Sequence, residues 1–374
     1  MDRDTIDVYE QRAAEWQAVR EPVDTTAAER FGRLVGALDL AGPVVDLGCG
    51  PGWYTPHLGR PVVALDATAA MLDLVPGYDP GAARVRADLA QLPFGRHRLK
   101  AAWASKCYLH LARSDVPMAL HDLHRALRVG GPAHFRLAGS SVTDIEDVDH
   151  LEHGFFDGDD FPGRRFSTWP AALLRAVLTG AGFTIERFDV GSTPEGHRWY
   201  TADTVRARTL ADTVGPDMRL LLCGLNPSVL SADVGRGFAR PGNRFWPAAV
   251  DAGVVTRAHD PVHALRVDRI GMTDLVKRAS PRADELTPAE YRAGLERLDL
   301  LAGWLQPRAI CFVGLAGWRA AADRKAVAGL QPRTLGGRPV YVMPNTSGIN
   351  ASSSLADLTD HLRAAASLAD EAGT

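Results

Sequence analysis

The chain has 374 residues, of which 46% are hydrophobic and 23% are charged, and its net charge is −3. This length exceeds one core of ordinary size, so we expect two domains. No apolar run approaches the roughly 18–20 residues that span a bilayer, and the acidic, amphipathic N-terminus lacks the apolar core of a signal peptide. The cysteines never form a Cys-x-x-Cys pair, which argues against a disulfide framework or a metal site. We therefore expect a cytoplasmic, reduced protein with no membrane partner and no metal.

The charge is divided unevenly between the two halves. Residues 1–200 hold 21 Lys and Arg against 27 Asp and Glu, a net −6, whereas residues 201–374 hold 21 against 18, a net +3. The basic residues of the second half are almost all Arg. This asymmetry favours a polyanion as a partner of the second half alone, although chance variation between two neutral domains would give the same pattern.

Strand patterns followed by helical patterns recur along the chain, which is typical of α/β architecture. In the first half we expect strands at 43–50, 61–68, 83–89, 99–106 and 132–139, helices at 114–127 and 168–183, and a late edge strand at 184–190. The pattern then restarts with strands at 218–227, 308–315 and 339–348 and a helix at 288–305. We place a linker at 191–215, which gives domains at residues 1–200 and 201–374.

A glycine-rich turn follows the first expected strand. Its glycines are Gly48, Gly50 and Gly52, and Asp46 precedes them. Glycines at such a turn let a ligand approach the backbone closely. The second strand ends in Asp66, 20 residues after Asp46, where a carboxylate suits a ribose diol. The third strand ends in Asp88-Leu89, a polar and apolar pair that suits the edge and face of an adenine.

With these motifs, residues 30–190 resemble the class I S-adenosylmethionine-dependent methyltransferases, as do "RALRVGG" (125–131) and the Ala-Gly-Phe that ends at 183. Dinucleotide-binding proteins are the competing interpretation, but their glycine fingerprint is Gly-x-Gly-x-x-Gly. The resemblance implies a Rossmann-like fold and a site for S-adenosyl-L-methionine formed by Asp46, Gly48, Gly50, Asp66, Asp88 and Leu89. The alternative is a fold that no longer binds a cofactor, in which Asp46 accepts hydrogen bonds from the backbone N–H groups of the turn. The methyl acceptor is unknown, because Lys106, Cys107, Tyr108 and His110 form no motif.

In the second half an apolar strand runs directly into Asn226. Other polar and aromatic side chains follow later in this half. Phe238 follows a glycine-rich loop, Asp274 lies on a turn within 268–280, and Asn345 follows the last expected strand. Loops at the carboxyl ends of an open α/β sheet converge on one crevice, so we expect these four residues to share a pocket. An Asn side chain can position water or a base edge but is no base at pH 7. Phe238 offers a stacking face, and Ile349 an apolar wedge for a duplex.

Four segments, "GLNPS" (224–228), "RPGNRFW" (240–246), "GMTDLVKR" (271–278) and "MPNTSGIN" (343–350), resemble the mismatch-specific uracil-DNA glycosylases in sequence and order. These enzymes are relatives of thymine-DNA glycosylase in the uracil-DNA glycosylase superfamily, and the resemblance spans about residues 215–365. It implies a parallel sheet flanked by helices. It also implies that Asn226 positions the attacking water, that Phe238 stacks on the flipped base, and that Ser231 touches the substrate strand or base. The wedge and its contacts to the widowed guanine come from Asn345, Ser347, Gly348, Ile349 and Asn350.

Two residues depart from some of these relatives. Asp274 replaces a non-acidic residue, and it is either a general base for the water or a cap of a helix-like segment after Thr273. Ala351 replaces a basic residue that could grip phosphate, a role that Asn350, Arg240 or Arg244 could take over.

The leading interpretation is a monomeric two-domain enzyme. Its second half would be a monofunctional glycosylase without a cofactor, acting on uracil, thymine or other damaged pyrimidines mispaired with guanine (G·U or G·T) in double-stranded DNA. Its first half would be a methyltransferase. The alternative is a methyltransferase whose second half only binds nucleic acid.

Overall fold

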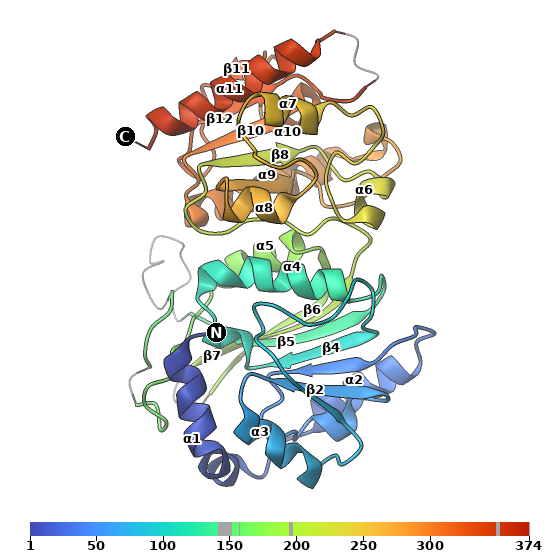
Figure 1. Cartoon of the computed structure of the whole chain (residues 1–374), viewed down its shortest axis with the longest axis vertical. Coiled ribbons are helices and arrows are strands. Elements are labelled where there is room, and N and C mark those ends of the chain that lie inside the picture. The colour runs from blue at the N-terminus through green and yellow to red at the C-terminus, as the bar shows by residue number, and fades with distance from the viewer. Residues whose placement is uncertain (141–151, 157, 194–196, 349–351, 374) are drawn as a thin grey trace. The chain divides into compact units, whose positions relative to one another are not determined.

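The computed structural model describes residues 1–140, 152–156, 158–193, 197–348 and 352–373. The chain forms two compact units (Figure 1). Unit 1 consists of Met1–Leu174 and Phe183–Ala207, and unit 2 consists of Arg175–Gly182 and Arg208–Thr374. Each unit is built around its own β-sheet, so the chain has the two-domain α/β fold that the sequence predicts.

The sheet of unit 1 has seven strands in the order β3-β2-β1-β4-β5-β7-β6. Strands β1 to β5 are parallel, and β7 runs antiparallel to both of its neighbours. The strands are β1 (Val44–Leu47), β2 (Val62–Asp66), β3 (Ala83–Arg86), β4 (Ala101–Ser105), β5 (Pro132–Ala138), β6 (Phe183–Ser192) and β7 (Arg198–Arg206). The helices are α1 (Arg3–Arg20), α2 (Thr26–Gly36), α3 (Ala69–Leu74), α4 (Val116–Ala126) and the first residues of α5 (Ala171–Gly180), which belongs to unit 2 from Arg175 onwards.

Hydrophobic side chains of one face of α2 hold it against this sheet. Phe31 and Val35 are buried against Val44 of β1 and Trp103 of β4. The α4 helix lies on the opposite face of the sheet from α2 (Figure 1). The carboxyl ends of the parallel strands are therefore left for the loops that form the cavity described below.

The interval 191–215 contains the boundary between the two units, between Ala207 and Arg208, but the prediction that it is a linker is wrong, because much of it belongs to the sheet of unit 1. β6 runs to Ser192, and β7 then occupies Arg198–Arg206 between β5 and the edge strand β6. Alternate residues of β7, including Tyr200, Ala202 and Thr204, are buried. This period-two pattern was present in the sequence, but the polar residues between the buried ones concealed it. The prediction of 184–190 as an edge strand is confirmed.

The sheet of unit 2 has five strands in the order β11-β12-β10-β8-β9, all parallel except for the short β11. They are β8 (Leu220–Gly224), β9 (Ile270–Asp274), β10 (Ala309–Val313), β11 (Gly329–Leu330) and β12 (Val340–Met343). The sequence did not predict β9, and Asp274 is the last residue of that strand rather than part of a turn. β9 pairs with β8 in a register that places Asp274 beside Gly224.

Six helices of unit 2 surround this sheet within the described residues. They are α6 (Val229–Val234), α7 (Phe245–Asp251), α8 (Pro261–Arg266), α9 (Pro288–Leu305), α10 (Leu315–Ala321) and α11 (Leu355–Glu371). Alternate strand residues such as Leu220, Leu222 and Cys311 pack with Trp246 of α7 and Leu358 of α11, and both helices lie on the same face of the sheet (Figure 1). In the described ranges of the whole chain, no helix is long and apolar enough to cross a membrane.

Candidate functional sites

The carboxyl ends of β8 and β9 bring two of the predicted residues of unit 2, Phe238 and Asp274, together. The backbone N–H of Leu275 donates to the carbonyl of Gly224 (2.9 Å), which continues the pairing past the end of β9. A Cβ atom on Gly224 would lie 2.5 Å from Oδ1 of Asp274 and 3.7 Å from Cζ of Phe238. The carboxylate and the aromatic ring therefore both lie over Gly224, where any larger residue would displace the carboxylate.

Asn226 is held in one orientation by the loop that follows β9. Its Nδ2 donates to the carbonyl of Arg278 (3.0 Å) and to Oγ of Ser280 (2.9 Å). Because a backbone carbonyl can only accept, these contacts fix which end of the amide is nitrogen. The Asn226 side-chain carbonyl consequently faces away from this loop and is available to accept a hydrogen bond.

The carboxylate of Asp274 accepts no hydrogen bond from any residue within the described ranges. Burial raises the pKa of Asp274 to about 6; the nearby Asp212 adds to this rise, while Lys277 and Arg297 oppose it. The predicted alternative, in which Asp274 caps a helix, is wrong, because no helix follows β9 directly: a short 3-10 helix begins at Ala283 and the next α-helix at Pro288. A carboxyl group with a pKa near neutrality is suited to accept a proton at physiological pH.

A buried ionic network contacts the backbone of Asp274, and no sequence motif predicts it. Asp212 accepts hydrogen bonds from Nζ of Lys277, Nη1 of Arg297 and Oγ1 of Thr273, each at 2.7 Å. Nη2 of Arg297 also donates to the backbone carbonyl of Asp274 (2.7 Å). No local motif marks this set, because its members come from residue 212, from the end of β9 and from α9.

Phe238 presents an aromatic platform beside Asp274. Its ring stacks on Phe245, with centroids 3.9 Å apart and an interplanar angle of 19°. Phe245 and Trp246 are fully buried, and Nε1 of Trp246 donates to the carbonyl of Gly237 (3.0 Å), which holds the loop. Phe238 itself has φ of +56°, a conformation that costs a non-glycine residue on the order of 1 kcal/mol or more. The packing beneath the loop therefore imposes the position of the ring.

Ser231 lies in α6 under the same loop. It is 3% exposed, and its Oγ accepts hydrogen bonds from Oγ of Ser228 (3.0 Å) and from the backbone N–H of Ala239 (3.4 Å). Ser228 in turn caps α6 by accepting from the Ser231 N–H. The hydroxyl of Ser231 thus contacts the loop that carries Phe238.

The described part of the predicted wedge loop is fastened to the "PGNRFW" segment. Oδ1 of Asn345 accepts from the N–H of Ser347 (2.8 Å), and a Cβ atom on Gly348 would lie 2.6 Å from the carbonyl oxygen of Gly242. Arg244 donates to the carbonyls of Ser347 and Ser353, so its guanidinium holds this loop. Ile349, Asn350 and Ala351 lie outside the described residues.

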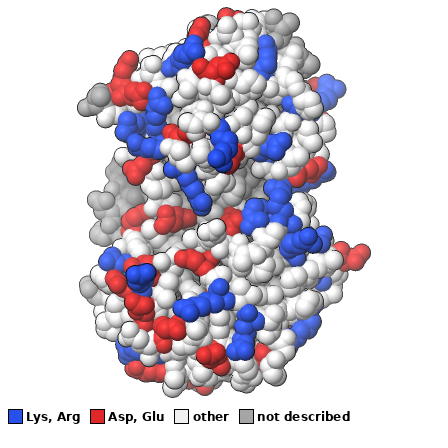
Figure 2. All heavy atoms as spheres, viewed as in Figure 1, with Lys and Arg blue, Asp and Glu red and all other residues white. Residues whose placement is uncertain are grey.

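Arg236 and Arg240 are exposed on the loop between α6 and α7. Nη2 of Arg240 donates to the carbonyl of Pro281 (2.9 Å), close to the segment that orients Asn226. Figure 2 shows basic and acidic side chains interspersed on the viewed face of unit 2, with no single block of positive charge. Both predicted arginines donate to backbone carbonyls, but Arg240 is exposed and makes one such bond to a described residue, whereas Arg244 is half-buried and makes two, so Arg240 is the better placed of the two for a phosphate contact.

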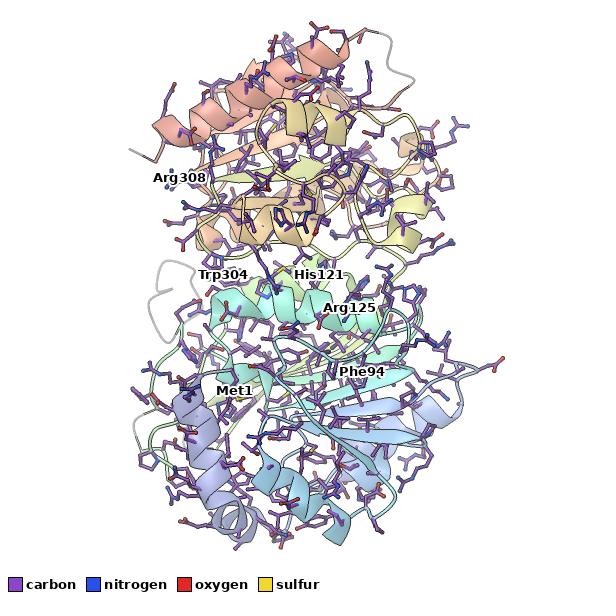
Figure 3. The ribbon with its side chains drawn as sticks, in the orientation of Figure 1. Met1, Phe94, His121, Arg125, Trp304 and Arg308 are labelled. Atoms are coloured by element: carbon purple, nitrogen blue, oxygen red, sulfur yellow. The ribbon has the colours of Figure 1, made fainter. Side chains whose placement is uncertain are left out.

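Unit 1 contains a cavity of about 1060 Å³ at the carboxyl ends of β1, β2, β4 and β5. Asp46, Gly48, Gly50 and Asp66 line it, as the sequence predicts for neighbouring strand ends. Met1, labelled in Figure 3, also lines this cavity. The structure does not bring the last predicted pair to the lining: Leu89 is 1% exposed in the core, and Asp88 accepts a hydrogen bond from the N–H of Ala90 (2.8 Å).

The glycines of the turn have different tasks. Gly48 and Gly50 both have positive φ, at +58° and +54°. A Cβ atom on Gly48 would lie 2.4 Å from Cβ of Cys107, whereas one on Gly50 would meet no described atom within 4 Å. Gly48 is therefore required for packing, while Gly50 leaves open space for a ligand close to the backbone.

The two carboxylates beside the turn are largely committed to the protein itself. Asp46 accepts from Oγ1 of Thr55 (2.7 Å), and burial raises its pKa to about 7. Asp66 accepts from the N–H of Gly50 (3.0 Å) and from both the N–H (3.0 Å) and the hydroxyl (2.8 Å) of Thr68. Three of the roughly four acceptor positions of Asp66 are thus filled, so a ligand diol would share this carboxylate with the turn.

A buried network that includes His110 joins α1 to the opposite wall of the cavity. Arg164 donates to the phenolic oxygen of Tyr9 (2.9 Å), and this hydroxyl lies 2.9 Å from Nε2 of His110. Nδ1 of His110 lies 2.8 Å from the carbonyl of Arg165, so Nδ1 carries the proton and Nε2 accepts from Tyr9. Burial lowers the pKa of His110 to about 4 and raises that of Tyr9 to about 12, so both are neutral near pH 7.

Two family models match the chain, one in each unit. Residues 211–368 match the uracil DNA glycosylase superfamily. Residues 44–131 match a methyltransferase domain. The chain thus carries one domain of each kind.

Solved structures similar to the chain include S-adenosylmethionine-dependent methyltransferases. One from Methanosarcina mazei is 16% identical, with 47% of this chain and 97% of that chain covered and a TM-score of 0.40. One from Mesorhizobium loti is 21% identical, with 49% and 100% covered and a TM-score of 0.38. The magnesium protoporphyrin IX methyltransferase of Synechocystis is 20% identical, with 54% and 98% covered and a TM-score of 0.39.

Proposed function

We propose that unit 2 is a DNA glycosylase that hydrolyses the N-glycosidic bond of uracil mispaired with guanine in double-stranded DNA. The observation that carries this proposal is the approach of Phe238 and Asp274 over Gly224 at the end of β8, two residues before Asn226. A platform, a proton acceptor and an oriented amide are the groups that base extrusion followed by hydrolysis requires. The superfamily match to residues 211–368 supports the same class of reaction.

Each of the three side chains has a separate task in this mechanism. The extruded base stacks on the free face of Phe238, whose other face rests on Phe245. The Asn226 side-chain carbonyl accepts a hydrogen bond from the attacking water, and the Asp274 carboxylate takes its proton. The water oxygen bonds to the sugar C1′ while the glycosidic bond breaks, and the bonding electron pair leaves on the base. Thymine and other damaged pyrimidines opposite guanine are further candidate substrates.

The loop at Asn345–Gly348, with Ile349 and Asn350, fills the gap that the extruded base leaves. Support for this role comes from the short approach of Gly348 to Gly242 and from the bonds of Arg244 to the loop, which fix its base. In this proposal the apolar side chain of Ile349 would enter the duplex from a base that these contacts hold in place.

A duplex with a single G·U pair, labelled on the uracil strand, tests this function. The full-length protein is incubated with the duplex, and abasic sites are then cleaved with alkali. We expect cleavage by the wild type and its loss in Asn226→Ala. An identical duplex with a G·C pair is the control for specificity. Binding of the duplex without any cleavage would contradict the proposal and favour the alternative, in which unit 2 only delivers a methyltransferase to nucleic acid.

We propose further that unit 1 binds S-adenosyl-L-methionine, which when bound would supply an electrophilic methyl group. The cavity fits this group: it is slightly larger than the roughly 300–1,000 Å³ of a single-ligand pocket, and it is open above Gly50. Asp66 and the turn at Gly48–Gly50 would hold the cofactor at one end. Calorimetry with S-adenosylmethionine is the test, and absence of binding by the folded wild type would contradict it.

A further inference from the structure

The wall of the unit 1 cavity opposite the glycine turn carries two cations on one indole. Lys106 follows β4, Arg136 belongs to β5 and Trp199 to β7, and the backbone N–H of Lys106 donates to the carbonyl of Arg136 (2.9 Å). Nζ of Lys106 lies 5.0 Å and Cζ of Arg136 5.5 Å from the centroid of the Trp199 ring. All three residues line the cavity. We name this group the Lys106–Arg136–Trp199 cluster.

The two cations of the cluster lack the ion pairs that three other cavity cations have. Arg20 forms an ion pair with Asp160 (2.9 Å), Arg164 with Asp159 and Arg187 with Asp189 (3.2 Å). Within the described part of the chain, neither Lys106 nor Arg136 has a carboxylate within 4 Å, and the buried Nε of Arg136 has no hydrogen-bond partner. Two adjacent, uncompensated positive charges are stabilised when an anion joins them.

Apolar and aromatic side chains surround the cluster. Trp199 and Phe156 pack against a buried group formed by Leu109, Ala138 and Phe166. The rings of Phe156 and Phe166 meet edge to face, with centroids 5.0 Å apart. Such walls bury a flat hydrocarbon body, whereas the two cations bind a charged group at its edge.

The charges of the whole lining favour one negative group over many. The described lining holds nearly equal numbers of acidic and basic side chains, so it is not a basic surface for a polyanion, and its acids would repel the repeated phosphates of a nucleic acid. The six carboxylates are Asp24, Asp46, Asp66, Asp159, Asp160 and Asp189, and the seven cations are Arg20, Arg30, Lys106, Arg136, Arg164, Arg187 and Arg198. A single carboxylate placed at the cluster avoids most of this repulsion, because the cations lie next to it and screen it from the acids.

We propose that the Lys106–Arg136–Trp199 cluster binds the methyl acceptor, and that this acceptor is a small molecule with a flat apolar body and one carboxylate. The inference rests on the methyltransferase function proposed for unit 1. The cavity, at about 1060 Å³, lies at the upper end of the usual range for a ligand pocket, and its lining extends from the ends of β1 and β2 to residues of β5 and β7. The cofactor would lie at the β1 and β2 ends and the acceptor at the β4, β5 and β7 ends.

Two probes of the same shape test the charge requirement on the full-length protein: 2-naphthoate and its neutral amide, 2-naphthamide. We expect calorimetry to give at least tenfold tighter binding of the naphthoate. The double variant Lys106→Met/Arg136→Met should lose this preference, while Trp199→Leu should weaken both probes. Arg33→Met, which removes an exposed charge of α2, is the matched control and should bind both probes like the wild type.

Several outcomes would overturn the inference. They are equal affinity for the two probes, no binding of naphthoate at millimolar concentration, a preference that survives in the double variant, or displacement of naphthoate by a single-stranded oligonucleotide at lower concentration. Titration with S-adenosylmethionine distinguishes failure of the proposed acceptor class from failure of the proposed methyltransferase function. Cofactor binding without naphthoate binding refutes the acceptor class alone, whereas naphthoate binding without cofactor binding refutes the methyltransferase proposal.

Discussion

Replacing Asp274 with Asn should separate catalysis from stability, because the substitution affects them in opposite directions. The isosteric amide keeps the shape of the side chain over Gly224 but cannot accept a proton from water. General-base catalysis contributes about 10²–10⁴-fold, which corresponds to about 3–5 kcal/mol of activation free energy. We therefore expect Asp274→Asn to lower the single-turnover rate on the G·U duplex by that factor at pH 7.5.

The pH dependence of the rate follows from the pKa of Asp274. Burial raises this pKa from 3.8 to about 6, so the carboxylate is protonated in the folded enzyme at pH 5 and ionised at pH 7.5. The wild-type rate should rise about tenfold per pH unit below pH 6 and level off above it, provided that Asp274 is the proton acceptor. The residual rate of Asp274→Asn should lack this acid limb.

The same raised pKa predicts that the variant is more stable than the wild type at neutral pH. Between about pH 4 and pH 6 the unfolded chain has released the Asp274 proton while the folded chain still holds it, so the free energy of unfolding falls as the pH rises. At pH 7 the ionised group costs the folded state at most about 3 kcal/mol, and less in practice because Asp274 is partly exposed. The neutral amide of Asp274→Asn would remove this cost.

Both effects are measurable on the same preparations. Alkali cleavage of the labelled duplex between pH 5 and pH 9 gives the rates, and calorimetric scans at pH 5 and pH 7.5 give the Tm of the unit 2 transition. We expect the Tm of Asp274→Asn to exceed that of the wild type by up to several degrees at pH 7.5 and by less at pH 5. Asp360→Asn, an exposed change on α11, is the control. A variant that cleaves within threefold of the wild-type rate, with the same acid limb, would refute the role of Asp274.

Four further substitutions test the rest of the two sites. Phe238→Leu should weaken duplex binding roughly 5- to 150-fold in a single-turnover titration, because stacking of a base on an aromatic ring contributes about 1–3 kcal/mol. Gly224→Ala places a Cβ atom 2.5 Å from Oδ1 of Asp274, so it should lower the cleavage rate at least tenfold while leaving duplex affinity within threefold. Arg240→Met should reduce the salt dependence of duplex binding by about one phosphate contact, a slope change of about 0.9 in log K against log salt. Asp66→Ala removes the acceptor of the Gly50 N–H and should weaken S-adenosylmethionine binding at least tenfold in calorimetry.

Most of the fold could be predicted because buried parallel strands leave continuous apolar runs. β1, β2, β4, β8 and β10 are such runs, and each lies within its predicted range. The strand β9 was not predicted, because "IGMTD" combines a glycine, a threonine and an acid in five residues, and only its pairing with β8 makes it a strand. The strand β7 was not predicted, because it is antiparallel and polar residues lie between its buried ones. In both cases the sheet partner, which the local sequence does not contain, decides the structure.

The positions of the site residues were more predictable than their surroundings. Strand-end topology alone brings Phe238 and Asp274 together, so the motifs were sufficient for that prediction. The sequence could not reveal that Arg244 would bind backbone carbonyls rather than phosphate, since an Arg serves either purpose. Nor could it place Asp88 and Leu89 outside the cavity lining, because the course of the loop after β3 depends on packing between distant residues.

In the proposed mechanism Asn226 and Asp274 have different tasks, because the surroundings of each residue suit it to only one of them. The hydrogen bonds of Asn226 to Arg278 and Ser280 fix its amide, but an amide cannot take a proton, so it can only orient the water. Lys277 donates its hydrogen bond to Asp212 rather than to the Asp274 carboxylate, so it lowers the pKa of Asp274 only through space, and burial still raises that pKa to about 6. If Lys277 paired directly with Asp274, the pKa of that carboxyl would fall further and the group would be a weaker base. The buried Asp212 network therefore does more than hold the fold: it engages the Lys277 ammonium in a hydrogen bond away from the carboxylate that accepts the proton in the proposed mechanism.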